Sequence, residues 1–203
     1  MTLDEEMYEK GFNIIAGIDE VGRGCLSGDV VACAVVMPKD NHIVGVMDSK
    51  KLSEKKRIAL DELIRKDAIA IGIGQVSPQV IDEINIKKAT RLAMKKAVLD
   101  LKDKQGNQVL PDLLLIDAEN IDLDIKQENI IKGDELSYSI SCASIVAKVY
   151  RDSLCQTWDE MYPGYNIKKH KGYGTKEHRE NIIKLGPSDN HRLTFLKKIL
   201  ENK

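Results

Sequence analysis

The sequence predicts a mixed α/β domain that is followed by a small, basic, helical C-terminal segment. Short apolar runs of strand length alternate with longer stretches whose apolar residues recur every three or four positions. A chain of 203 residues suits one domain, and a hydrophobic content of 42% is enough for an ordinary core. We place the domain at residues 1–164 and the basic segment at residues 165–203.

The first strands are expected near the N-terminus. Residues 14–18, 30–37 and 42–47 are short apolar stretches with short links, which predicts an antiparallel meander. The stretch at 30–37 is the longest apolar run. It is far shorter than the roughly 20 residues that cross a bilayer, so we expect no membrane partner. Alternation returns at residues 68–76 and predicts a fourth strand.

Helices are expected between and after these strands. Ser53 can cap a helix over residues 54–66, and a Ser-Pro pair can begin a long helix from residue 78 to about 102. The clearest helical pattern covers residues 140–161, where apolar residues lie three or four positions apart.

Two further strands and two short helices complete the expected elements. Residues 113–116 form a compact apolar run that ends in Asp117, and residues 125–131 form a weaker one. In the basic segment, residues 177–184 and 191–200 predict short helices.

The cysteines and the N-terminal residues indicate a cytoplasmic protein. The first residues, MTLDEEMYEKGF, are acidic and lack the basic-then-apolar order of a signal peptide. The four cysteines show no CxxC spacing, so we expect packed thiols in preference to a zinc or redox site. They are Cys25, Cys33, Cys142 and Cys155.

Acidic residues follow three of the predicted strands: Asp19 with Glu20, Asp117, and Asp134. Strand ends open into loops, where catalytic groups are common. Carboxylates gathered there would repel one another unless divalent cations bind, and oxygen-only ligands favour Mg²⁺ or Mn²⁺ over zinc. Two such ions suit in-line displacement at phosphorus. The alternative is that these are ordinary solvated acids, since the chain has 32 acidic residues.

A glycine-rich turn, Gly22-Arg23-Gly24, follows the first pair of acids and is called the glycine turn below. It lacks the glycine spacing of a dinucleotide-binding loop and the Lys and Ser or Thr of a P-loop. Its backbone N–H groups and its guanidinium could approach a sugar-phosphate closely. A plain hairpin turn is the alternative.

Other residues could contact phosphates or sugars. Ser49 and Lys50 follow the third predicted strand, and Lys148 and Arg151 are placed on the polar side of the strongest helix. Tyr173 lies between two glycines in a basic loop, where a ring can stack on a sugar or a base. Solvated side chains and a core tyrosine are the alternative interpretations.

Seven motifs, in order, make the chain resemble the ribonuclease HII family over residues 14 to about 196. They are AGIDEVGRG at 16–24, DSKKLS at 48–53, LLLID ending at 117, KGD at 132–134, CASIVAKVYRD at 142–152, HKGYGTKEH at 170–178 and GPSDNHRLTF at 186–195. The resemblance implies a ribonuclease H-like mixed five-stranded sheet flanked by helices, with a small helical C-terminal extension.

The resemblance also implies an activity and a metal site. Members of the family cut the RNA strand of RNA–DNA hybrids and nick duplex DNA on the 5′ side of an embedded ribonucleotide. The products carry 5′-phosphate and 3′-hydroxyl ends. By motif, Asp19, Glu20, Asp117 and Asp134 are the catalytic carboxylates that bind Mg²⁺ or Mn²⁺.

Substrate-reading residues follow from the same motifs. The resemblance implies that the glycine turn reads the 2′-hydroxyl at the junction of ribose and deoxyribose, largely through backbone atoms. Tyr173 would stack on the following deoxyribose, and Ser49, Lys50 and Lys148 would contact the substrate.

Some positions compete with the family pattern or depart from it. Asp152 is an alternative fourth carboxylate, and we prefer Asp134 because it follows a strand whereas Asp152 lies inside a helix. Cys25 and Asp29 stand where prolines are usual, and Ala118 stands where glycine is usual. Asp29 adds an acid near the site that could weaken DNA approach or perturb metal affinity. The arginine of the glycine turn separates the chain from the ribonuclease HIII group.

The net charge of −1 conceals two unlike regions. Ten Lys or Arg against four acids give residues 165–203 a charge of +6, whereas 21 against 28 give the preceding residues −7. An acidic catalytic domain is thus joined to a basic segment that can hold phosphates. We expect a monomer that acts on RNA–DNA hybrids and ribonucleotide-containing DNA duplexes. A two-metal, structure-selective DNA endonuclease and a hybrid-binding module without catalysis are the alternatives.

Overall fold

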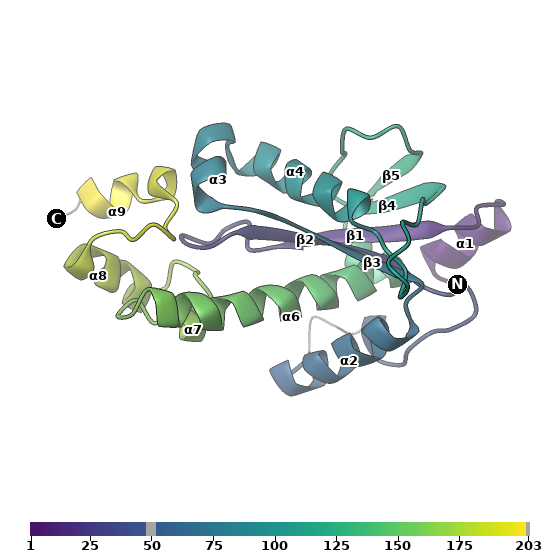
Figure 1. The fold of residues 1–203 in the computed structure, drawn as a ribbon, viewed down its shortest axis with the longest axis horizontal. Helices are drawn as coiled ribbons and strands as arrows, with labels where there is room; N and C mark the ends of the chain where they lie inside the picture. Colours follow the sequence, from purple (N-terminus) through teal and green to yellow (C-terminus); the bar gives the residue numbers. More distant parts are fainter. Residues whose placement is uncertain (48–51, 202–203) are drawn as a thin grey trace.

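The computed structural model describes residues 1–47 and 52–201, and its centre is a mixed five-stranded sheet, which confirms the expected fold class (Figure 1). The strand order is β3-β2-β1-β4-β5. β2 pairs antiparallel with β1 and β3, whereas β4 pairs parallel with β1 and β5. The strands are β1 (Ile15–Val21), β2 (Val30–Val36), β3 (Ala70–Val76), β4 (Leu113–Asp117) and β5 (Gln127–Ile130).

Helices cover both faces of the sheet (Figure 1). α4 (Ile86–Leu99) packs on one face, and α6 (Tyr138–Met161) packs on the other, with α2 (Glu54–Asp67) beside it. α6 approaches β1 so closely that a methyl group at Gly17 would lie 2.1 Å from the carbonyl carbon of Ser139. A glycine at this position therefore lets the longest helix reach the strand that carries the first acids.

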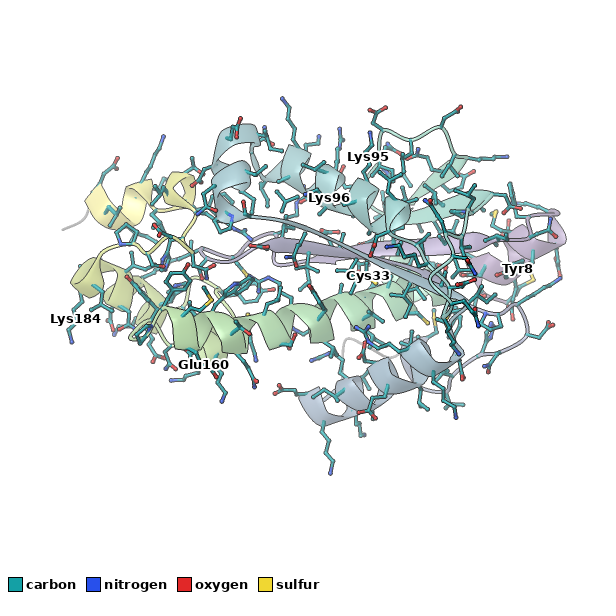
Figure 2. The ribbon with its side chains drawn as sticks, viewed as in Figure 1. Tyr8, Cys33, Lys95, Lys96, Glu160 and Lys184 are labelled. Carbon is teal, nitrogen blue, oxygen red and sulfur yellow. The ribbon has the colours of Figure 1, made fainter. Side chains whose placement is uncertain are left out.

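Short helices lie at the two ends of the molecule. α1 (Leu3–Glu9), which carries Tyr8, is at one end, and α8 (Lys176–Leu185), which carries Lys184, is at the other (Figure 2). The remaining short helices are α3 (Pro78–Ile84), α5 (Gly133–Leu136), α7 (Ile167–His170), the 3₁₀ helix Leu193–Phe195 and α9 (Lys197–Glu201). Within the described residues, none of the helices combines the length and the apolar character that a bilayer crossing requires.

The four cysteines are buried free thiols, as predicted. Cys33 lies in β2, in the middle of the sheet (Figure 2). Its side chain packs with Cys142 of α6 in the core on that face, and burial raises the pKa of both thiols. Because all four thiols are buried and unpaired, their role is to fill space in the core.

The strand predicted at residues 42–47 is wrong. The segment contains a turn in which the Val46 N–H donates to the Ile43 carbonyl, and the Ile43 N–H donates to the Tyr138 hydroxyl at 2.8 Å. Ile43, Val46 and Met47 pack against the core between the sheet and α6, whereas Val44 is exposed, so the run is apolar without being a strand. The third strand of the meander is β3.

Two predicted helices also differ from the structure. The helix expected from residue 78 to about 102 is two helices, because Asn85 has a φ of +73° and its side chain accepts the Lys88 N–H at 3.0 Å. Asparagine tolerates the left-handed region and caps helices well. The helix expected at 191–200 is wrong in its first part, since His191 pairs with Ser27 in an isolated β-bridge and α9 begins at Lys197.

Candidate active site

Asp19 and Asp117 come together because β1 and β4 are parallel neighbours. The register pairs Ile18 with Ile116, so one further step along both strands brings Asp19 beside Asp117. Neighbouring parallel strands end at the same edge of the sheet. The two acids therefore meet at that edge, although they are far apart in sequence. Glu20 follows Asp19 at the end of β1, and we call these three residues the acidic cluster.

Burial and crowding act together on the acidic cluster. The pKa of Asp19 lies well above its usual range because the carboxyl is buried and faces the charges of Glu20 and Asp117. Hydrogen bonds to Asp19 from the Ser144 hydroxyl and from the Glu20 N–H, at 2.7 Å, lower this pKa but do not cancel the shift. Burial also raises the pKa of Glu20, although Arg23 opposes it. A nearby cation would relieve this mutual repulsion.

Asp134 lies beside the acidic cluster, in the first turn of α5 just beyond β5. Its neighbour Gly133 donates its N–H to Asp117 Oδ1 at 2.6 Å, so the backbone next to Asp134 touches the cluster. The competing acid, Asp152, lies in α6 with its carboxylate 3.8 Å from the Lys148 ammonium. The assignment of Asp134 as the fourth ligand is still a prediction.

The donor atoms of the acidic cluster suit a hard divalent cation. They are carboxylate oxygens, and the buried Glu20 Oε2 accepts no hydrogen bond from the part of the chain that the structure describes. Among the described residues, no group of three or more His, Cys, Asp or Glu side chains is arranged to hold a metal ion by itself. The carboxylate oxygens, with Glu20 Oε2 unpartnered within the described part of the chain, are the kind of donors that Mg²⁺ uses when one or two carboxylates and substrate phosphates hold it.

Arg192 holds the glycine turn from inside the protein. Its side chain is fully buried and donates to the carbonyls of Gly22 at 2.7 Å, Arg23 at 3.0 Å and Gly28 at 2.8 Å. Burial lowers the pKa of Arg192 to about 10, so the guanidinium is charged at neutral pH. Its planar fork of donors matches several carbonyls at once, which compensates the buried charge. No pattern in the sequence distinguishes this arginine from an exposed one.

Arg151 is a second buried arginine, and its predicted phosphate contact is wrong. It is 1% exposed and donates to the carbonyls of Ser27 at 3.0 Å, Asp29 at 3.0 Å and Lys171 at 2.7 Å. The loop after the glycine turn covers this end of α6, so a helical position that looks polar in sequence is interior. Lys148, one turn earlier, is partly exposed and pairs with an acid of its own helix.

Arg23 points toward acids at the edge of the sheet. Its Nη1 lies 3.3 Å from Glu119 Oε1 and 3.8 Å from Glu20 Oε1. Glu119 is 4% exposed and also accepts from Arg91 Nε at 2.8 Å. Sequence reasoning missed Glu119, although its place two residues after Asp117 could have indicated it. It also missed the Ser144 hydroxyl, for which helix periodicity offered no signal.

The structure brings Tyr173 to the segment that follows the glycine turn. Its side chain is 42% exposed, in the loop between α7 and α8, and burial, together with the nearby Cys25 thiol, raises the pKa of its hydroxyl. The adjacent Gly172 carbonyl accepts the Leu26 N–H at 2.8 Å. Tyr173 and the glycine turn, far apart in sequence, therefore belong to one surface.

The other predicted positions have varied outcomes. Ser49 and Lys50 lie outside the described residues. Ala118 has a φ of +51°, a left-handed conformation that favours the glycine usual there. Asp29 is partly buried, and burial raises the pKa of its carboxyl although Arg151 and Arg192 oppose the shift. The positive charges of these two arginines partly offset the negative charge of the Asp29 carboxylate.

Known proteins share this sequence and this architecture. The model of the ribonuclease HII family matches residues 16–198. The ribonuclease HII of Alkaliphilus metalliredigens is 57% identical over 201 residues, which cover 99% of this chain and 98% of that protein. The crystal structure of the ribonuclease H2 from Pyrococcus horikoshii OT3 aligns with a TM-score of 0.77 at 23% identity, covering 94% of this chain and 98% of that one. Bst-RNase HIII in complex with Mn²⁺ aligns with a TM-score of 0.71 at 18% identity, covering 98% and 72%. The two structures share the fold.

Proposed function

This chain belongs to the ribonuclease HII family and is a nuclease of the ribonuclease H type, and we propose that it both cuts RNA in RNA–DNA hybrids and nicks DNA duplexes 5′ of a single ribonucleotide. The products would carry 5′-phosphate and 3′-hydroxyl ends. The observation that carries the proposal is the position of the acidic cluster, at the strand ends next to a turn that presents backbone groups. Its action as a monomer in the cytoplasm is still a prediction.

The acids have distinct parts in the proposed reaction. Asp19, Glu20, Asp117 and Asp134 would hold Mg²⁺ or Mn²⁺. When bound, a pair of such ions would activate water and stabilise the leaving oxygen of the phosphodiester. Ser144 and the Glu20 N–H fix the orientation of the Asp19 carboxylate, while the Gly133 N–H fixes Asp117. These contacts preorganise the cluster before substrate arrives.

Recognition of the substrate would involve both the glycine turn and the basic segment. Arg192 donates hydrogen bonds to the carbonyls of Gly22 and Arg23. The peptide groups held in this way would face the 2′-hydroxyl of the substrate. The basic segment, residues 165–203, would hold the phosphate backbone with its charge of +6 (ten Lys or Arg against four acids). Lys148, partly exposed on α6, would add a contact to the substrate.

Cleavage of a DNA duplex that contains one ribonucleotide, with and without Mg²⁺, tests this function. We expect a single nick on the 5′ side of the ribonucleotide, only when the metal is present. An all-DNA branched substrate serves as the comparison. Cleavage of the branched DNA alone would point to a structure-selective DNA endonuclease, and binding without any metal-dependent cut would point to a hybrid-binding module.

Replacing Tyr173 by alanine is expected to impair cleavage at single ribonucleotides selectively. Stacking of one nucleotide on an aromatic ring contributes about 1–3 kcal/mol, so we expect a loss of about tenfold on the single-ribonucleotide duplex and a smaller loss on a continuous hybrid. Rates on the two substrates provide the measurement. Tyr173→Phe keeps the ring and should behave like the wild type. An equal loss on both substrates would contradict the junction-reading role.

A further inference from the structure

Three histidines form a buried cluster directly behind the loop that carries Tyr173. The rings of His170 and His178 stack with centroids 4.0 Å apart and an interplanar angle of 18°. His178 and His191 face one another through their Nε2 atoms at 3.1 Å. All three are less than 9% exposed, so they are unavailable for direct contact with a substrate, and neither the acidic cluster nor the glycine turn uses them.

Backbone donors fix the protons on two of these rings. The Gly172 N–H donates to His170 Nδ1 at 3.1 Å, and the Ser188 N–H donates to His191 Nδ1 at 3.0 Å. A backbone N–H can only donate, so both Nδ1 atoms are acceptors and the proton of each neutral ring is on Nε2. The Nε2–H of His170 accordingly donates to the Tyr165 carbonyl at 2.7 Å.

The same logic determines the tautomer of the third ring. The Nε2–H of His191 points at His178 Nε2, which must therefore accept. The remaining proton of His178 is then on Nδ1, which donates to the Tyr173 carbonyl at 2.8 Å. Burial lowers the pKa of both His178 and His191 to about 4, so both rings are neutral at physiological pH and this pattern of donors is stable.

The segment that contains His191 is also bonded to the glycine turn and to the residues that follow it. The Asn190 carbonyl accepts the Gly28 N–H at 2.8 Å, and the Arg192 N–H donates to the Leu26 carbonyl at 2.9 Å. The Arg192 guanidinium continues this attachment by binding the carbonyls of the glycine turn. Two adjacent residues, His191 and Arg192, thus connect to Tyr173 and to the glycine turn respectively.

We propose that His178 and His191 are positioning residues that hold Tyr173 at a fixed spacing from the glycine turn and thereby set the preference for a ribose–deoxyribose junction. The inference rests on the proposed role of Tyr173. The path runs from His191 Nε2–H to His178 Nε2, and from His178 Nδ1–H to the Tyr173 carbonyl. Without it, the backbone at Tyr173 loses one of its anchors and the ring can shift relative to the turn. A displacement of that kind affects the junction substrate more than a continuous hybrid.

His191→Leu and His191→Gln provide the functional test. Leucine removes the donor, whereas the glutamine amide can place an N–H near the position of Nε2. We expect the ratio of single-ribonucleotide to continuous-hybrid cleavage to fall about tenfold in His191→Leu, because small misplacements at a reacting site are costly. His191→Gln should restore most of the ratio. Ile182→Ala, a buried change in α8, the helix that carries His178, controls for general destabilisation and should leave the ratio unchanged.

Nitrogen NMR of the histidine side chains tests the hydrogen-bond path from His191 through His178 to Tyr173 without any cleavage assay. At neutral pH we expect His178 to carry its proton on Nδ1 and both His170 and His191 to carry theirs on Nε2. A charged His178, a proton on His178 Nε2, or an unchanged substrate ratio in His191→Leu would overturn the inference, and so would the same fall in Ile182→Ala. A wild-type enzyme that cuts no ribonucleotide-containing substrate would instead contradict the proposed function.

Discussion

Asp19→Asn is expected to abolish cleavage while making the metal-free protein more stable. The substitution keeps the shape of the side chain and removes a charge that is buried beside Glu20 and Asp117. If metal-supported stabilisation of the transition state amounts to several kcal/mol, the rate should fall by about 10³-fold or more. Binding of the hybrid should be largely retained, since the Asp19 side chain is buried and contributes little to the contacts with the phosphate backbone.

The stability arm of this prediction follows from the direction of the pKa shift. The pKa of Asp19 is raised in the folded protein, so its contribution to stability is present at low pH and is lost as pH rises through the folded-state pKa. In EDTA at neutral pH, urea unfolding should therefore show a higher free energy of unfolding for Asp19→Asn. Asp122→Asn, an exposed acid on the loop after β4, is the matched control and should change neither quantity. Full activity of Asp19→Asn with magnesium would sink the mechanism.

The parts of the fold that could be predicted are those with local causes. α6 has a continuous apolar stripe and a serine cap, and the apolar run of β2 is buried on both faces. Residues 42–47 were misassigned because an apolar loop that covers a core has the same composition as a strand. Asn85 was missed because one left-handed residue interrupts a helix without disturbing its apolar spacing.

The candidate site was predictable only in part, for a related reason. Each acid could be placed at a strand end, but the pairing of β1 with β4 joins segments about a hundred residues apart, which no local pattern encodes. The family resemblance provided that grouping. The interior contacts of Arg151 and Arg192 depend on how the C-terminal loops fold over the glycine turn. Their chemistry alone suggested surface residues, because arginine is rarely fully buried.

Arg192→Met is expected to cost the protein about 3 kcal/mol or more of unfolding free energy. The substitution keeps much of the side-chain volume but removes the donors that three backbone carbonyls share. Leaving buried polar groups without partners costs about 1–3 kcal/mol each, and partial relaxation of the turn will recover some of that. Urea unfolding measures the loss. The free energy of unfolding of Arg192→Lys should lie between those of the wild type and Arg192→Met, because an ammonium cannot reproduce the planar fork of donors.

Cleavage should fall further in Arg192→Met than the stability loss explains. Under conditions where the variant is fully folded, the glycine turn would still lack the contacts that orient Gly22 and Arg23, and a displacement of about 1 Å at a reacting site can cost 10²-fold in rate. Arg179→Met, an exposed change on α8, removes the same positive charge from the basic segment and isolates the electrostatic part. If Arg179→Met lowered cleavage as much as Arg192→Met at matched folding, general charge would account for the effect. A larger loss in Arg192→Met would instead assign it to the geometry of the glycine turn.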